Sequence, residues 1–187
     1  MRRLGFWISL LLAGAAACGY GSINPIISES DGQFEPRLVG TWQGPEGKES
    51  ATITREGANG YLVAFRDEEG KTGRFRAQLG HVGAFRALDL QPAELPEGLP
   101  DLYKGLLLPL HAPVILDSIS EMLQFRFLEG DSIKSLLTRR PSDAAHVIRE
   151  GVVVLTGSTA EVQRFLTAMV RRPGVLTDSA VFRRQQP

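Results

Sequence analysis

From Leu38 onward, short apolar or alternating segments are separated by turns that contain glycine. The clearest alternation is in residues 72–79, where Phe75, Ala77 and Leu79 are interleaved with two arginines and a glutamine. A period of two directs one side of a strand into a core and the other side into water. The repeated pattern therefore predicts a meandering antiparallel sheet.

The predicted strands extend to the C-terminal end of the chain. They cover residues 38–42, 50–55, 61–66, 72–79, 84–90, 106–118, 122–128, 146–148, 152–155 and 175–183. Residues 91–101 carry three prolines and cannot be regular sheet, because proline has no amide hydrogen to donate. Residues 132–140 fit either a helix or a strand.

One helix is predicted near the C-terminus. Ser158 and Glu161 have the spacing of a capping box, and Pro173 with Gly174 ends the segment. Between them, apolar residues recur at helical spacing and form one stripe. They are Val162, Phe165, Leu166, Met169 and Val170.

The tripeptide Gly40-Thr41-Trp42 resembles the Gly-x-Trp that opens the lipocalin barrel. That resemblance implies a Trp42 packed under the barrel floor against an arginine from near the end of the barrel, here Arg183 or Arg184. The predicted fold is mainly β, an antiparallel meander forming a lipocalin-like barrel of about 8–10 strands with one C-terminal α-helix before the last strand. The alternative is an open sheet or sandwich packed by the helix.

The first 17 residues have the three parts of an export signal. Met1-Arg2-Arg3 is positive, residues 4–12 are uncharged and largely apolar, and residues 13–17 are small. The apolar run is shorter than the about 20 residues that a membrane-spanning helix needs. A cleaved signal peptide is therefore predicted.

Cys18 is the only cysteine, and it directly follows Ala15-Ala16-Ala17. This arrangement resembles the lipobox of bacterial lipoproteins, although Ala15 stands where leucine is usual. The resemblance implies that Cys18 carries lipid and attaches the chain to the membrane of a bacterial envelope. Gly19 after the cysteine then favours the outer membrane of a Gram-negative cell. The same alanines also fit ordinary signal peptidase, which would release a soluble protein, but an unpaired thiol in an oxidising compartment favours lipidation.

The mature chain divides into two parts. Residues 18–36 contain glycine, serine, asparagine, proline and acidic residues with little periodicity, and they are predicted to be a flexible tether. Residues 37–187 are predicted to form a single β-barrel-like domain. With 43% hydrophobic residues the chain is able to bury a core of that size.

Charge excludes one class of partner. Lysine plus arginine equals aspartate plus glutamate at 21 each, so no positive field attracts nucleic acid. Residues 131–187 carry 9 basic and 5 acidic side chains. This basic end fits ordinary solvated charge, or a surface that faces anionic lipid or an acidic partner.

No motif for catalysis, a metal or a cofactor is present, and no enzymatic activity is predicted. The histidines His81, His111 and His146 are far apart and lack metal-ligand spacing. Asp89 and Asp117 lie in or beside apolar strands, where each carboxylate must pair or point outward.

Two short blocks resemble those of the SGNH hydrolases. They are Gly130-Asp131-Ser132-Ile133 and Asp143-Ala144-Ala145-His146. In that family the blocks lie near opposite ends of an α/β domain, whereas here they are close together and the surrounding pattern is not alternating β/α. The match is therefore interpreted as coincidence.

Two functions remain open. The first is a barrel that binds a small apolar or amphipathic ligand, with Trp42, Phe65, Phe75 and Tyr103 as candidate ligand-binding residues around an internal void. The leucine-rich residues 95–110 then form a lid, a patch for a partner, or a cover over one end of the core. The second is a structural or accessory lipoprotein with a packed interior, which contacts another envelope protein through an exposed apolar patch.

Overall fold

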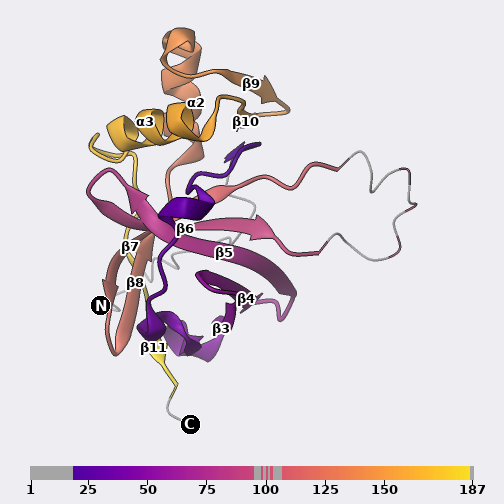
Figure 1. Ribbon diagram of the computed structural model, residues 1–187, viewed down its shortest axis with the longest axis vertical. Coiled ribbons are helices and arrows are strands. Elements are labelled where there is room, and N and C mark those ends of the chain that lie inside the picture. The colour runs from indigo at the N-terminus through magenta and orange to yellow at the C-terminus, as the bar shows by residue number, and fades with distance from the viewer. Residues whose placement is uncertain (1–18, 95–97, 99, 101, 103–106, 186–187) are drawn as a thin grey trace, which may run out of the picture.

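The computed structural model describes residues 19–94, 98, 100, 102 and 107–185. Eight antiparallel strands form a closed barrel in the order β11-β2-β3-β4-β5-β6-β7-β8 (Figure 1). The barrel strands are β2 (Gly40–Gln43), β3 (Ser50–Glu56), β4 (Gly60–Arg66), β5 (Thr72–Val82), β6 (Phe85–Pro92), β7 (Ala112–Ile119), β8 (Met122–Arg126) and β11 (Ala180–Arg184). The mainly β, lipocalin-like barrel is confirmed, and its closure decides against the open sheet or sandwich.

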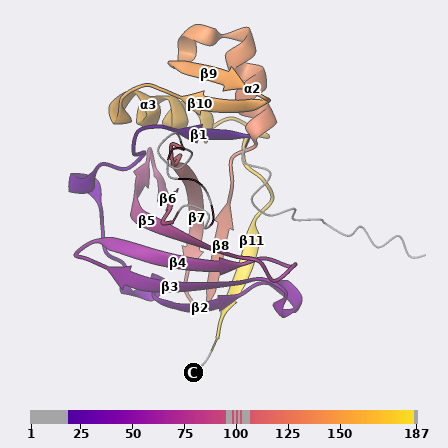
Figure 2. The same ribbon diagram turned by 90° about the vertical axis from the view of Figure 1, so that its right-hand side faces the viewer.

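A second layer covers one end of the barrel (Figure 2). It contains a small sheet in the order β1-β10-β9 and two helices. Its elements are β1 (Tyr20–Ser22), β9 (His146–Arg149), β10 (Val152–Leu155), α2 (Gly130–Arg139) and α3 (Thr159–Met169). Short 3-10 turns span Glu29–Asp31, Pro36–Leu38, Pro45–Gly47 and Pro141–Asp143. None of the helices in the described ranges is long and apolar enough to cross a membrane.

Two apolar cores result from this layering. One lies inside the barrel and includes Trp42, Tyr61 and Phe182. The other lies between the barrel wall and the second layer, where Ile115 of β7 meets residues of α2 and α3 such as Leu166. The barrel strands in contact with both cores are therefore apolar on both faces over part of their length, as Leu88 and Ala87 of β6 show.

The helical elements follow from local sequence. Residues 132–140, which fitted either state, lie largely in α2, because Ile133, Leu136 and Leu137 then fall on one buried stripe. The capping box predicted for α3 is confirmed. The Ser158 hydroxyl accepts a hydrogen bond from the Glu161 amide, and the Glu161 carboxylate accepts one from the Ser158 amide at 2.8 Å.

The predicted flexible tether is wrong for the described part of residues 18–36, which is packed against the rest of the protein; Cys18 lies outside the described residues. β1 pairs with β10, and Tyr20, Ile26 and Ile27 are each at most 3% exposed. A strand of three residues is too short to show a period of two. Its partner β10 is more than a hundred residues away, so local pattern did not reveal it.

The β9–β10 hairpin was predicted at the correct place in the sequence, but it pairs with β1 and not with the barrel. Its two-residue turn consists of Glu150 (φ 49°) and Gly151 (φ 86°). Positive φ at both positions gives the tight twisted turn that hairpins favour. The turn therefore lies at the same end of the small sheet as the start of β1, because β1 runs parallel to β10.

Candidate functional site

The floor of the barrel is built around Trp42, which is fully buried. Its indole N–H donates to the Leu38 carbonyl at 2.9 Å. The guanidinium of Arg184 lies 4.2 Å from the centre of the ring and donates to the carbonyls of Val39, at 2.8 Å, and Arg37. The predicted cation–π partner is thus Arg184, which is in register with Trp42 on the neighbouring strand, whereas Arg183 is exposed.

The other predicted ligand-binding residues differ in what surrounds them. Phe65 and Phe75 are partly buried against the cluster inside the barrel, to which Trp42 also belongs. Phe65 and Trp42 both lie opposite Ala51 in the strand register. The structure therefore brings three of the four candidates into one interior, while Tyr103 lies outside the described residues.

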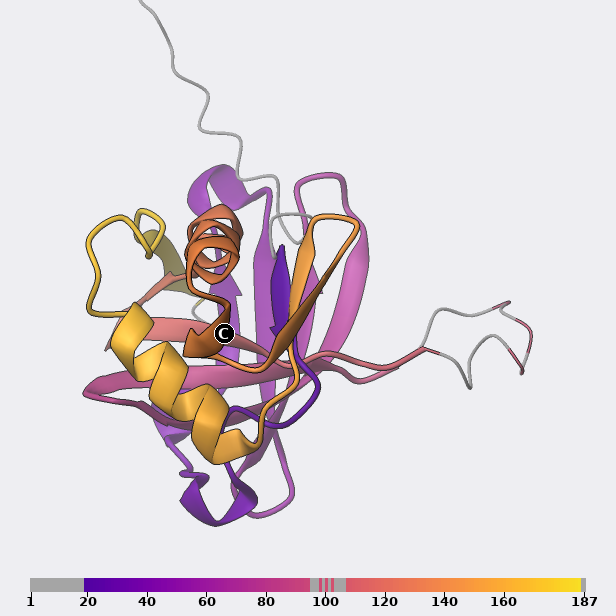
Figure 3. The same ribbon diagram turned by 90° about the horizontal axis from the view of Figure 1, so that it is seen from above.

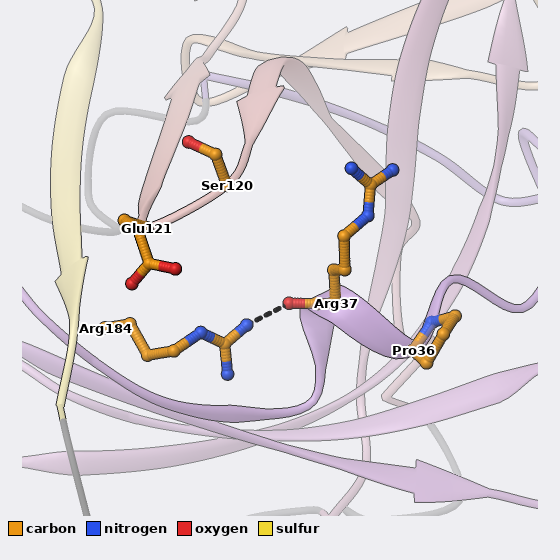
Figure 4. Close-up of a pocket in the computed structure, with 5 residues that line it drawn as sticks. All are labelled: Pro36, Arg37, Ser120, Glu121 and Arg184. Atoms are coloured by element: carbon orange, nitrogen blue, oxygen red, sulfur yellow. Dashed lines mark hydrogen bonds between the residues drawn. The ribbon is translucent and has the colours of Figure 1, made fainter.

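A hollow of about 460 Å³ lies outside the barrel floor. Figure 4 shows the Arg184 guanidinium directed at the Arg37 carbonyl, while the Arg37 guanidinium points elsewhere. The Arg37 side chain instead donates twice to the Glu35 carboxylate, at 2.8 and 2.6 Å. Both arginines are thus engaged with the protein itself. The lining is completed by Pro36, Ser120 and Glu121.

Glu35 is the most strongly shifted carboxyl near this floor. Its pKa falls from 4.5 to about 2, chiefly because the Arg37 side chain donates hydrogen bonds to the ionised form. Arg86, 3.3 Å away, acts in the same direction. The backbone amide of Glu35 donates to the Tyr61 hydroxyl at 2.6 Å, so this ion pair is fixed to a residue of the barrel interior.

A second hollow, of about 600 Å³, lies between the β5–β6 hairpin, α3 and the turn Glu29–Asp31. Its lining is mostly polar: Ser30, Asp31, Gly32, Gln33, His81, Gly83, Gln163 and Thr167. Neither hollow is lined by a residue of the interior cluster. These two hollows are therefore not an internal void of the barrel.

Asp89 is a buried carboxylate that joins the N-terminal segment to the barrel. It is 4% exposed and accepts hydrogen bonds from the amides of Ile26, at 2.8 Å, and Ile27, at 3.2 Å. His111 Nδ1 lies 3.1 Å from both of its oxygens. Of the two expected arrangements, pairing or pointing outward, Asp89 adopts the first.

Asp117, the other carboxylate that was expected to pair or point outward, pairs with Arg126 on the neighbouring strand, at distances down to 2.6 Å. Glu49 was not anticipated from the sequence. It is 6% exposed, and burial raises its pKa, assisted by the negative charges of Glu68 and Asp67. No local signal marks Glu49, which directly precedes β3.

No hydrogen bond joins the described residues of one hydrolase-like block to those of the other. The Ser132 hydroxyl donates to the Gly174 carbonyl at 3.1 Å, and His146 Nδ1 lies 2.8 Å from the Ala144 carbonyl. Within the described ranges, no three His, Cys, Asp or Glu side chains gather closely enough to hold a metal ion. Ser132 and His146 are thus each hydrogen-bonded to a backbone carbonyl.

Exposed apolar side chains are the remaining candidate for a functional surface. Among described residues the large ones are Leu102 (79% exposed), Leu108 (63%), Val147 (50%), Ile148 (39%), Met122 (38%) and Leu107 (36%). The leucines belong to the long β6–β7 connection, and the two β-branched residues belong to β9. The sequence indicated the exposed leucines through the leucine-rich composition of residues 95–110. For β9 it predicted a strand but not an exposed apolar surface.

Comparison with known proteins gives no relative: no protein family model, no curated protein and no solved structure matches this chain. Functional inference therefore depends on the residues and the geometry described above.

Proposed function

We propose that this protein is a lipid-anchored, non-enzymatic accessory protein of the bacterial cell envelope, whose filled barrel is a scaffold that acts through its outer surface. The observation that carries this proposal is the packing of the interior. Trp42, Tyr61 and Leu79 are each at most 1% exposed, and the two hollows lie outside the barrel. Large apolar side chains are instead exposed on the outside, which is typical of a contact surface.

Anchoring is proposed to occur through lipid on Cys18. The export-type N-terminus, the small residues before the cysteine and the absence of any other cysteine support it. Each buried methylene contributes about 0.8 kcal/mol, so several acyl chains hold a protein of this size permanently. The attached domain then lies on the far side of the membrane from the site of synthesis.

The anchor is tested by labelling cells with a radioactive fatty acid. The wild-type chain should carry the label and sediment with membranes, and Cys18→Ala should lose both properties. A wild-type protein that is processed, unlabelled and recovered in the soluble fraction would show ordinary secretion instead.

A ligand-binding barrel remains the second candidate, because Phe65 and Phe75 are only partly buried within the interior cluster. Native mass spectrometry of residues 19–187, before and after denaturation with solvent extraction, separates the two functions. The scaffold proposal expects the mass of the bare chain under gentle conditions. A stoichiometric extra mass that disappears on denaturation would overturn it in favour of a carrier of small apolar molecules.

A further inference from the structure

The start of the described chain is fixed within the fold. The Gly19 carbonyl accepts a hydrogen bond from the Val153 amide at 2.7 Å, and β1 begins at the next residue. Gly19 also lies against the first residue of α2, since a Cβ on Gly130 would stand 2.9 Å from the Gly19 nitrogen. Cys18 is joined to Gly19 by a single peptide bond, which sets about 3.8 Å between consecutive Cα atoms.

One face of the small sheet points away from the helices. Val147, Val154 and Gly21 are in register across its three strands and share a face. The opposite face carries Tyr20 and Val153, which are buried in the core beneath α2 and α3. Figure 3 shows the two helices on one side of this sheet and the described residues that lead into β7 on the other.

Leucines continue this face. The Leu110 side chain lies over Gly21, where a Cβ would approach it to 2.9 Å, and His111 pairs with Ser22 of β1. From Leu110 the chain leads to Leu108 and Leu107, which are 63% and 36% exposed. We call the surface formed by Val147, Val154, Leu107, Leu108 and Leu110 the outer apolar face. Gly21, which is in register with Val154 of this face, is two residues from Gly19.

Charges around Gly19 have mixed signs. Lys134 Nζ lies beside Gly151, where a Cβ would stand 3.7 Å from it, and Arg149 is in the same hairpin. Glu150 in the turn and Glu129 before α2 oppose them. Contact at this end of the protein therefore depends on apolar burial and not on attraction to anionic lipid.

We propose that the outer apolar face rests on the bilayer, so that the protein has a second membrane contact and is held in one orientation beside the membrane. This inference rests on the lipid anchor proposed for Cys18. A single peptide link then brings the sheet to the lipid surface, and the face that begins at Gly21 is the apolar surface within reach. The leucines enter the region between headgroups and acyl chains and are buried there from water.

The test uses the sole cysteine as a chemical handle. The mature chain, residues 18–187, is coupled through Cys18 to a maleimide-bearing phospholipid in neutral vesicles. The thioether reproduces the anchor whether or not cells lipidate the protein, so failure of the inference is distinguishable from failure of the proposed lipidation. Fluorescence quenching by brominated acyl chains then reports contact with the membrane interior.

Leu108→Trp is the reporter variant, because the side chain is exposed and its replacement disturbs no core. Arg171→Trp is the matched control, because Arg171 is exposed in the turn that follows α3 and lies outside the outer apolar face. The only other tryptophan of the mature chain, Trp42, is buried in the barrel floor. We expect quenching of at least about twofold for Leu108→Trp and almost none for Arg171→Trp, with little change when anionic lipid is added.

Equal quenching of the two variants, or none for Leu108→Trp, overturns the proposal. In that case a photoreactive group at position 108 in whole cells identifies the alternative occupant. Crosslinking to one envelope protein would assign the face to a protein partner, and crosslinking to a second copy of the chain would assign it to self-association.

Discussion

Arg184 of β11 stacks on Trp42 of β2, with 4.2 Å between the guanidinium carbon and the ring centre. The two residues are also direct partners in the ladder that joins the last barrel strand to the first. The stacking therefore lies on the seam where the barrel closes. It links the floor of the interior to the end of the chain, so closure of the barrel and burial of Trp42 depend on the same contact.

The first prediction concerns this seam. Arg184→Met removes the cation–π contact and leaves the carbonyls of Val39 and Arg37 without their donors. We expect the free energy of unfolding to fall by about 1–3 kcal/mol. Urea denaturation followed by tryptophan fluorescence measures it. Arg183→Met, at the exposed neighbour, should change stability by less than about 0.5 kcal/mol; equal effects would contradict a special role for Arg184.

The second prediction concerns the buried carboxylate that holds the N-terminal segment. Asp89→Asn removes the charge that faces His111 and weakens the bonds from the Ile26 and Ile27 amides. A loss of about 2–4 kcal/mol is expected. Hydrogen exchange should also become faster at those two amides. The control is Asp117→Asn, whose partly exposed pair with Arg126 should be worth about 1 kcal/mol or less; unchanged exchange at Ile26 and Ile27 would refute the predicted role of Asp89.

A third prediction follows from the lowered pKa of Glu35. Because the folded-state pKa is about 2 and the ordinary value is 4.5, its ion pairs stabilise the fold above pH 4.5. That contribution is lost as the pH falls through 2. Glu35→Gln should thus cost about 1–2 kcal/mol near neutral pH, after allowance for the exposure of Arg37, and nothing in strong acid. Denaturation curves across this range test it; Glu46→Gln, which breaks a fully exposed pair with Lys48, should have a smaller effect.

Glu49 provides a prediction of opposite sign. Burial raises the pKa of Glu49, because the ionised carboxylate is poorly solvated in the folded protein. The folded state is therefore not penalised below pH 4.5, where Glu49 is neutral, and it loses stability as the pH rises and the carboxylate ionises. Glu49→Gln should therefore be more stable than wild type near neutral pH and equal to it in acid. The same set of denaturation curves measures this difference. A variant that is less stable than wild type at neutral pH would show that the ionised carboxylate has a stabilising role.

Much of the barrel was predictable because its strands carry local information. Alternation in β5 and the glycine-containing turns around β3 and β4 placed those strands within a few residues of their observed bounds. The capping box located α3 in the same way. The stacking of Trp42 on an arginine was predicted from the Gly-x-Trp resemblance. The periodicity of apolar residues alone does not predict that contact.

Features that depend on distant partners were not predictable. β1 and β10 pair across more than a hundred residues. Asp89 of β6 contacts His111, which precedes β7, and also the amides of Ile26 and Ile27 in the N-terminal segment. Local composition made residues 18–36 resemble a linker, since glycine, serine and proline are frequent there. Only the assembled core shows that Ile26 and Ile27 are buried.

The last prediction tests how tightly the start of the described chain, at Gly19, is held. Gly130 is the first residue of α2, where alanine would ordinarily stabilise the helix by about 0.5–1 kcal/mol. Here the added Cβ would stand 2.9 Å from the Gly19 nitrogen and 3.0 Å from its Cα, and backbone atoms cannot rotate away.

Gly130→Ala should therefore destabilise the protein by about 1–3 kcal/mol and displace β1 from β10. Faster hydrogen exchange at the Val153 amide, which is bonded to Gly19, reports that displacement directly. Ser135→Ala, at an exposed position on the same helix, should leave this exchange unchanged. If Gly130→Ala is instead as stable as wild type and keeps the Val153 amide protected, Gly19 has room to move. An anchor at Cys18 would then no longer fix the orientation of the barrel.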